Sequence, residues 1–172
     1  MERWDLYTQD RKLTGQTMVR GEAIPAGLYH LVVGIWTINS QGRVLLTLRH
    51  PNKEVYPNTW ENSGGAAKAG ESSLEAAQRE LEEETGYRAA NYTSLGCMYP
   101  TPGCCDEKVY IYLATGLTQS EAHPDSDEFL AVERCPLDEM VKRVLAGEIT
   151  DAKTQIGILK TKLLLDSQKE EA

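Results

Sequence analysis

One stretch, from Gly65 to Tyr87, constrains the fold of this chain more than any other. It reads GAAKAGESSLEAAQRELEEETGY. Ser72 is followed three residues later by Glu75, which is the pattern of a capping box at the start of a helix. Gly86 accepts the left-handed conformation that commonly ends a helix. The stretch therefore predicts a loop followed by a helix of about four turns.

The predicted helix has three distinct faces when residues are placed 100° apart. An apolar stripe is formed by Leu74, Ala77 and Leu81. An acidic face is formed by Glu80, Glu83 and Glu84, and we expect the small Ala76 to lie within it and leave room for ions. A third face, with Glu75, Gln78 and Glu82, is assigned to water.

The acidic face is unfavourable unless something neutralises it. Carboxylates four residues apart, such as Glu80 and Glu84, repel each other by a few tenths of a kcal/mol, roughly. A hard divalent cation removes this repulsion and matches carboxylate oxygens. Charge runs are usually only solvated helix faces, but this one lies in the C-terminal half, where the helix dipole disfavours negative charge. Arg79, four residues before Glu83, can hold and orient that side chain.

The spacing of these residues resembles a known family motif. Gly65, Glu71 and the run Arg79-Glu80-Leu81-x-Glu83-Glu84-x-Gly86 match the Nudix box, so the chain resembles a Nudix hydrolase. Tyr87 departs from the aliphatic residue that usually follows. The resemblance implies an α/β Nudix fold, a mixed β-sheet sandwiched between helices, and Mg²⁺- or Mn²⁺-dependent cleavage of a diphosphate bond in a nucleoside diphosphate linked to another group.

The resemblance also implies roles for individual residues. Glu80 and Glu84 would be the main metal ligands, with Glu83 sharing and the carbonyl of Gly64 adding a further ligand. Arg79 would orient rather than react, and Glu71 would close the loop or touch Arg79. The general base is a box glutamate (Glu83 here) in some Nudix enzymes and lies on a later acidic loop in ADP-ribose pyrophosphatases. The candidates on that loop are Asp125, Asp127 and Glu128, with Glu107 behind them.

The flanks of the box resemble two different subgroups. The stretch YPTPGCCDEKVYIYLATGL, with Pro102, resembles ADP-ribose pyrophosphatases. The N-terminal half, including YHLVVGIWTINSQGRVLLTLRHPNK, resembles Nudix proteins related to isopentenyl diphosphate isomerase. The first resemblance predicts hydrolysis of ADP-ribose or a nucleoside diphosphate sugar, the second an isomerase of isoprenoid diphosphates. The segment after Trp60 lacks the cysteine that the isomerase uses. A non-catalytic nucleotide-binding module is a third alternative.

Other polar residues give weaker indications. Arg49 and Lys53 follow the strand that precedes the box and could clamp phosphate, or could simply face solvent. The histidines at 30, 50 and 123 show no ligand spacing and are assigned structural or surface positions. The adjacent Cys104 and Cys105 do not fit simple zinc spacing, and a nucleophilic role for one of them remains an alternative.

Composition limits the class of protein. The chain has 172 residues, a formal net charge of −8, and 41% hydrophobic residues, which predicts one domain; the resemblance implies that residues 1–172 form a single Nudix domain. The charge disfavours nucleic acid or an anionic membrane as a partner. The four cysteines predict reduced thiols in a cytoplasmic protein. Residues 1–26 are expected to form an N-terminal extension, and such extensions in this family often cross to a partner, which implies a homodimer.

The remaining periodicity predicts the other elements. We expect an N-terminal hairpin from Trp4–Tyr7 and Met18–Ala23, and a second hairpin that pairs Tyr29–Ile38 with Arg43–Arg49. Strands are expected at Ala90–Tyr99, Lys108–Thr115 and Phe129–Arg134. Helices are expected at Leu137–Ala146 and Asp151–Leu165, and the buried stripe of the last one should be Ile156, Leu159, Leu163 and Leu164.

Overall fold

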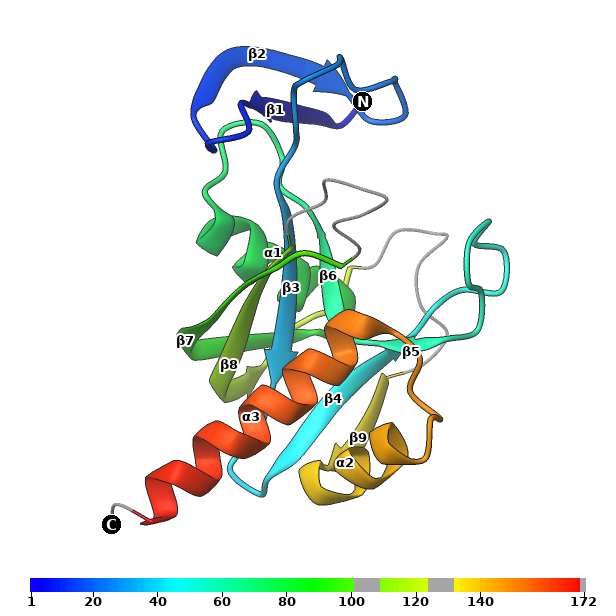
Figure 1. Cartoon of the computed structure of the whole chain (residues 1–172), viewed down its shortest axis with the longest axis vertical. Coiled ribbons are helices and arrows are strands. Elements are labelled where there is room, and N and C mark those ends of the chain that lie inside the picture. Colours follow the sequence, from blue (N-terminus) through cyan, green and yellow to red (C-terminus); the bar gives the residue numbers. More distant parts are fainter. Residues whose placement is uncertain (101–108, 124–131, 171–172) are drawn as a thin grey trace.

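The computed structural model describes residues 1–100, 109–123 and 132–170 (Figure 1). Its elements follow one another as β1 Arg3–Tyr7, β2 Leu13–Val19, β3 Val32–Thr37, β4 Arg43–Leu48, β5 Trp60–Glu61, β6 Ser63–Ala66, α1 Ser73–Thr85, β7 Tyr87–Met98, β8 Val109–Gln119, β9 Val132–Pro136, α2 Leu137–Leu145 and α3 Ala152–Glu170. Within these ranges, no helix is both long enough and apolar enough to cross a bilayer.

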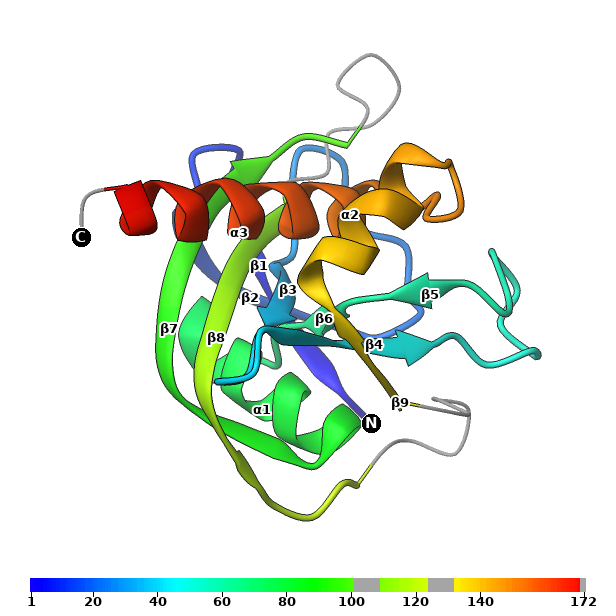
Figure 2. The same ribbon diagram turned by 90° about the horizontal axis from the view of Figure 1, so that it is seen from below.

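Two sheets form the body of the molecule. The larger is mixed, in the order β6-β3-β8-β7, with β3 and β8 parallel and the other neighbours antiparallel. The smaller is antiparallel, in the order β5-β4-β9. Helices α1 and α3 lie on opposite sides of the larger sheet (Figure 2), which agrees with the predicted α/β architecture.

The expected hairpin between Tyr29–Ile38 and Arg43–Arg49 is wrong. β3 and β4 are consecutive, but each belongs to a different sheet, and only an isolated bridge between Ile38 and Val44 joins them. Both strands are buried along most of their length. Because their side chains are apolar on both faces, the local pattern does not reveal which neighbour each strand takes.

Helix α1 forms as its sequence predicts, with one correction. The Ser72 and Glu75 capping box is present, and Gly86 ends the helix at φ 68°, in the left-handed region. Ala76 does not lie among the acidic side chains, because it is fully buried in an apolar cluster with Val33, Ile35, Ala77 and Leu81. The helix therefore packs on β3 through two small alanines, and Leu74, expected in the stripe, is 42% exposed.

The predicted buried stripe of helix α3 is partly wrong: Ile156 and Leu164 are partly buried against the core, but Leu159 and Leu163 are exposed. Its buried residues are Thr154, Gly157, Ile158 and Thr161. Leu163, expected in the buried stripe, is 70% exposed, and Leu159 is 37% exposed. Gly157 lies against the fully buried Trp36 of β3, and a Cβ at Gly157 would meet Trp36 Cδ2 at 3.2 Å. The large ring requires a small residue opposite it, and this requirement selects the packed face.

The N-terminal hairpin, β1 and β2, is present and docks at one end of the larger sheet (Figure 1). Its second strand begins at Leu13 and ends at Val19, earlier than expected. Tyr7 and Tyr29 exchange two main-chain hydrogen bonds, of 2.8 and 2.9 Å. The hairpin also contacts the loop that precedes α1, because the Ala69 N–H donates to the Arg3 carbonyl at 2.8 Å.

Candidate active site

Two box glutamates are buried against the glycines of β6. Glu80 and Glu84 are only 8% and 5% exposed. The Gly64 N–H donates to Glu84 Oε2 at 3.1 Å. A Cβ on Gly64 would lie 2.4 Å from the Val33 carbonyl oxygen, and one on Gly65 would lie 2.5 Å from Glu80 Oε1. The glycines therefore let β6 approach both its neighbouring strand and the helix carboxylates.

Arg79 organises the acidic side chains around it. Its Nε and Nη2 donate to the two carboxylate oxygens of Glu71 at 2.7 and 2.9 Å. Its Nη1 donates to Glu80 at 2.8 Å and to Glu83 at 2.9 Å. Nη2 also donates to the Ala66 carbonyl at 3.0 Å. These contacts occupy all five N–H groups of a guanidinium, so Arg79 links the loop, the helix and β6.

This network shifts the acidity of its members. Burial opposes the charged form of Arg79, but the bonds to Glu71, Glu80 and Glu83 outweigh it and raise the Arg79 pKa. Burial also opposes ionisation of Glu71, but the hydrogen bonds from Arg79 and from the Lys68 N–H lower the Glu71 pKa. Both groups are therefore held in their charged forms at neutral pH.

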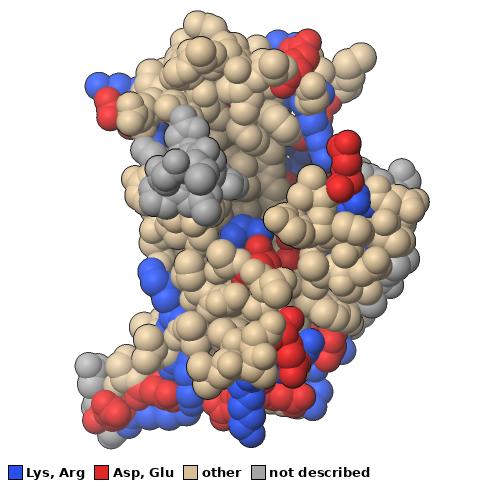
Figure 3. Space-filling model, turned by 45° about the vertical axis from the view of Figure 1, so that its right-hand side comes forward, with Lys and Arg blue, Asp and Glu red and all other residues tan. Residues whose placement is uncertain are grey.

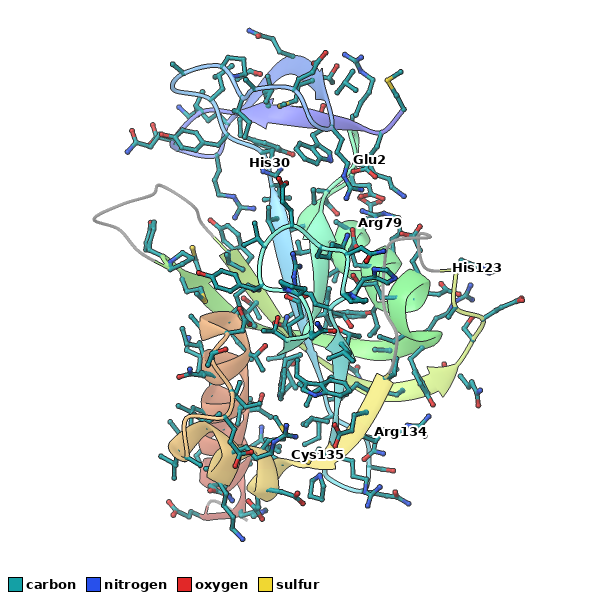
Figure 4. All side chains as sticks on the ribbon, turned by 90° about the vertical axis from the view of Figure 1, so that its right-hand side faces the viewer. Glu2, His30, Arg79, His123, Arg134 and Cys135 are labelled. Carbon is teal, nitrogen blue, oxygen red and sulfur yellow. The ribbon has the colours of Figure 1, made fainter. Side chains whose placement is uncertain are left out.

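Glu80 and Glu83 line a pocket of about 240 Å³, which Glu84 and Glu71 do not line. Figure 4 shows Glu2 of the hairpin above Arg79, with His123 beside the helix. Figure 3 shows this part of the surface hollowed below the hairpin, with acidic and basic side chains in the hollow. The residues that line the pocket come from the hairpin, β6, the loop 67–72 between β6 and α1, α1 itself and the segment after β8. They are Glu2, Trp4, Arg20, Gly65, Ala66, Lys68, Arg79, Glu80, Glu83 and His123.

A larger cavity of about 420 Å³ lies beside the hairpin, and its lining includes Tyr7, Tyr29, His30 and Tyr110 but no box glutamate. The two cavities are linked through a ring pair. Trp4, which lines the acidic pocket, stacks on His30 with centroids 4.3 Å apart and an interplanar angle of 13°. The acidic pocket is the better candidate for diphosphate chemistry, because it alone of the two contains the clustered carboxylates.

The donor set of the acidic pocket fits a hard divalent cation. Its acidic groups are carboxylates, the ligands that Mg²⁺ and Mn²⁺ prefer. Across the described ranges, however, no three acidic, histidine or cysteine side chains are already gathered as a metal cluster. Glu80 and Glu83 instead bond to Arg79 Nη1. Binding a cation would therefore require these carboxylates to turn from Arg79 toward the ion.

The structure places the other predicted residues differently. Arg49 donates to Glu61 at 3.1 Å and to the Val55 carbonyl at 3.1 Å, and neither Arg49 nor Lys53 lines the acidic pocket. Four predicted site residues lie outside the described residues: Pro102, Glu107, Asp127 and Glu128. The alternative candidates Asp125, Cys104 and Cys105 also lie outside them.

Sequence reasoning missed several residues of this pocket. His123 is predicted to be a structural or surface residue, but it lines the pocket, and its N–H donates to the Glu83 carbonyl at 2.9 Å. Glu2, Trp4 and Arg20 reach the pocket from the hairpin. These residues are far from the box in sequence and carry no motif, so only the docking of the hairpin reveals them.

Comparison with known proteins identifies the family that this chain resembles in sequence. A family model described as the NUDIX domain matches residues 28–154. An ADP-ribose pyrophosphatase of Bacillus subtilis (strain 168) is 31% identical over 169 residues, which cover 96% of this chain and 89% of that protein. An uncharacterized Nudix hydrolase of Listeria monocytogenes serovar 1/2a is 44% identical over 87 residues, which cover 50% of this chain.

The matched relatives differ in how much of their own length this chain covers. The chain spans about half the length of the Listeria relative, 52%. A crystal structure of a Deinococcus radiodurans protein superposes with a TM-score of 0.67 at 22% identity, covering 92% of this chain and 98% of that one, which supports the fold. The names of these relatives give no support to the isomerase alternative.

Proposed function

The chain belongs to the NUDIX domain family, and on that premise we propose that it is a metal-dependent pyrophosphohydrolase. Its proposed substrate is ADP-ribose or another nucleoside diphosphate sugar. The observation that carries the proposal is the pairing of two buried carboxylates, Glu80 and Glu84, with the glycines of β6 at the edge of an open pocket. The name of the Bacillus subtilis relative supports the choice of substrate.

The metal in this proposal is Mg²⁺ or Mn²⁺. The residues that would hold it are Glu80, Glu83, Glu84 and the carbonyl oxygen of Gly64. When bound, such an ion neutralises phosphoryl oxygens and lowers the pKa of an attacking water. Gly64 is suited to this role because its backbone lies beside Glu84, where the Gly64 N–H already donates to the carboxylate.

The chain's own residues would position the reacting groups. Arg79 holds Glu71 through charge-assisted hydrogen bonds of 2.7 and 2.9 Å, which are stronger than neutral ones, and it bonds to Glu83 at 2.9 Å before an ion is bound. Glu83, with a side chain 36% exposed, is the box glutamate that remains open to water at the pocket. We propose Glu83, or else Asp127 or Glu128, as the general base.

The choice among these bases is testable by kinetics. Changing the true base to Gln should lower kcat much more than it raises KM, because a base acts only in the transition state. The same change at whichever of Asp127 and Glu128 is not the base should alter kcat little, whereas Glu83→Gln also removes a proposed metal ligand and should lower kcat in either case. A chain that keeps full kcat after all three changes has its base elsewhere.

A substrate panel tests the proposed function. ADP-ribose, nucleoside diphosphate sugars, dinucleoside polyphosphates, nucleoside triphosphates and isopentenyl diphosphate are each incubated with the protein and Mg²⁺, and the products are identified. We expect AMP and ribose 5-phosphate from ADP-ribose, since attack falls on the diphosphate, and no product in excess EDTA. Turnover of only triphosphates or isoprenoid diphosphates contradicts the substrate. Full turnover in EDTA contradicts the metal requirement, and binding without turnover identifies a non-catalytic module.

Two further properties belong to the proposal. We propose a homodimer, from the N-terminal extension typical of the family, and light scattering coupled to size exclusion tests it. We also propose a cytoplasmic location, and Cys97 and Cys135 are free thiols in the structure. Oxidising compartments would favour disulfides instead.

A further inference from the structure

The chain passes from the smaller sheet to the larger one at Asn62. β5 ends at Glu61 and pairs with β4, whereas β6 begins at Ser63 and pairs with β3. Asn62 is only 4% exposed, and its Nδ2 donates to the Ser63 carbonyl at 2.9 Å and to the Ile35 carbonyl at 3.4 Å. Gly34 of β3 makes room for this amide, because a Cβ on Gly34 would lie 2.9 Å from Nδ2. The position of Asn62 therefore determines where β6 begins against β3.

The first turn of α3 holds Asn62 in place. Thr154 is fully buried, and its Oγ1 accepts a hydrogen bond of 3.0 Å from the Asn62 N–H. The same hydroxyl lies 2.7 Å from Asp151 Oδ2 and 3.3 Å from Asn62 Oδ1. A hydroxyl has one proton to donate, and the shorter contact, to a carboxylate, is the stronger one. Thr154 therefore donates to Asp151 and offers a lone pair to the Asn62 N–H.

Asp151 is held so that it keeps the Thr154 hydroxyl in this orientation. Its Oδ2 also accepts the Thr154 N–H at 2.8 Å, and its Oδ1 accepts from Lys153 Nζ at 2.6 Å. Burial opposes ionisation of Asp151, but Lys153 and the Thr154 bonds outweigh it and lower the Asp151 pKa. Lys153 Nζ also lies 3.8 Å from Glu61 Oε2. The start of α3 is thus bonded to both residues that precede β6, Glu61 and Asn62.

Gly64, two positions beyond Asn62, contributes to the proposed metal site. The Gly64 N–H donates to Glu84 Oε2 at 3.1 Å, and the Gly64 carbonyl oxygen is one of the groups proposed to hold the metal. Gly64 pairs with Gly34 in the register of β3 and β6, so neither residue of this pair has a side chain that packs it in place. The position of Gly64 therefore depends on the residues that flank it, and Asn62 is bonded to α3.

We propose that Thr154 is a positioning residue for the metal site, because it holds Asn62 and thereby fixes the Gly64 carbonyl beside Glu84. Thr154 acts on the site only through Asn62. Removing a group that orients a metal ligand commonly costs about 10- to 100-fold in metal affinity. The last helix of the domain therefore takes part in metal binding, although it supplies no ligand. The inference rests on the proposed function for the identity of the ligand, a divalent cation.

Two substitutions at Thr154 separate positioning from packing. Thr154→Val keeps the shape but removes the acceptor of the Asn62 N–H, so the Kd for Mn²⁺ should rise about tenfold, the low end of the usual range. Thr154→Ser keeps the hydroxyl but loses a buried methyl group, so it should bind Mn²⁺ within about twofold of wild type yet unfold at lower urea. Kd is measured without substrate, from the electron paramagnetic resonance signal of free Mn²⁺. A purely structural role would lower the urea midpoint of both variants and leave both Kd values unchanged.

The matched control is Thr161→Val. Thr161 lies on the same helix and is equally buried, but its hydroxyl has no hydrogen-bond partner within the described part of the chain. Removing this hydroxyl should therefore leave the Mn²⁺ Kd at the wild-type value. A Kd that rises equally in Thr161→Val and Thr154→Val would overturn the inference, because any buried change in α3 would then weaken the site.

Hydrolysis gives an independent measurement. The Mn²⁺ concentration that half-saturates hydrolysis of ADP-ribose should rise in Thr154→Val by the same factor as the Kd. If wild-type protein binds Mn²⁺ and Thr154→Val binds it equally well, the inference about Thr154 is overturned while the proposed function stands. If wild-type protein binds Mn²⁺ but does not hydrolyse ADP-ribose, the proposed substrate fails, and Kd alone decides the role of Thr154. Wild-type protein that binds no Mn²⁺ overturns both.

Asp151→Asn provides the test if Thr154→Val does not fold. This variant leaves the Thr154 hydroxyl in place but removes the charge that orients it, so the Mn²⁺ Kd should rise at least about threefold. A wild-type Kd in folded Asp151→Asn would then overturn the inference.

Discussion

The carboxylate of Glu80 lies directly against Gly65, so that a Cβ on Gly65 would be only 2.5 Å from Glu80 Oε1. This distance is far below van der Waals contact, so no residue with a side chain fits without moving the carboxylate. Glu80 also bonds to Arg79 at 2.8 Å and is 8% exposed. The absence of a side chain at Gly65 therefore determines the position of the Glu80 carboxylate.

Gly65→Ala should reduce hydrolysis more than it reduces stability. The added methyl group displaces Glu80, and a displacement near 1 Å at a reacting centre can cost about 100-fold in rate. We expect kcat for ADP-ribose to fall at least about tenfold, with a folded protein by circular dichroism. Unchanged kcat at saturating Mg²⁺ would show that the position of Glu80 does not matter to the reaction.

Glu84→Gln should leave the fold intact and lower kcat by about two orders of magnitude or more, which is the usual cost of losing one electrostatic stabiliser of a transition state. Glu82→Gln is the matched control, because Glu82 lies on the same helix but bonds to Arg88 and Ser120 at 2.7 and 2.6 Å, whereas Glu84 accepts a hydrogen bond from Gly64 of β6. Steady-state kinetics and Mn²⁺ titration compare the two. Equal rates for both variants would remove Glu84 from the set of metal ligands.

The Glu71 and Arg79 pair predicts loss of stability in acid. The Glu71 pKa is lower in the folded protein than its ordinary value of 4.5, so the unfolded chain binds more protons in this range. The stabilisation is complete above pH 4.5 and is lost as the pH falls through the lower, folded pKa. Glu71→Gln should cost about 2 kcal/mol at pH 7, because Arg79 loses a charged partner.

Urea unfolding at a series of pH values measures this effect. Below pH 4.5, the free energy of unfolding of wild-type protein should fall more steeply than that of Glu71→Gln, and the two should converge. Parallel curves for the two proteins would mean that other carboxylates account for the acid sensitivity.

The local parts of this structure are predictable from sequence because they depend on near neighbours. The capping box at Ser72, the stop at Gly86 and the contact between Arg79 and Glu83 are all set within one helix. The assignment of β3 and β4 to separate sheets is not local. It depends on strands that come much later in the chain, and buried apolar strands carry no mark of their partners.

The candidate site divides in the same way. The residues of α1 and β6 follow from one contiguous motif, which fixes their order and spacing. Arg20 and His123 enter the pocket only because the hairpin and the segment after β8 pack beside α1. A lone arginine or histidine has no sequence pattern that distinguishes a pocket position from a surface position. Their contribution depends on tertiary packing and could not have been derived from spacing.

Leu163 tests the corrected orientation of α3. If this residue were buried, as the apolar stripe of the sequence suggests, its replacement by a small or polar residue would cost about 2–5 kcal/mol. It is 70% exposed, so Leu163→Lys should change the free energy of unfolding by no more than about 0.5 kcal/mol. Chemical denaturation measures the difference. A loss above about 2 kcal/mol would indicate that Leu163 is covered in solution.

Gly157→Ala tests the opposite face of the same helix, where two effects compete. In an exposed helix interior, replacing Gly by Ala gains about 1 kcal/mol of helix propensity. At this position the new methyl group would lie 3.2 Å from Trp36 Cδ2 and 3.3 Å from Cγ, and overpacking of a core costs about 1–3 kcal/mol. Trp36 is fully buried among Ile38, Leu46 and Ile158, so the ring has no free space to move into. We therefore expect a net loss of about 1 kcal/mol, measured as a lower urea midpoint with an unchanged slope. A higher midpoint would show that the ring yields and that helix propensity determines the outcome.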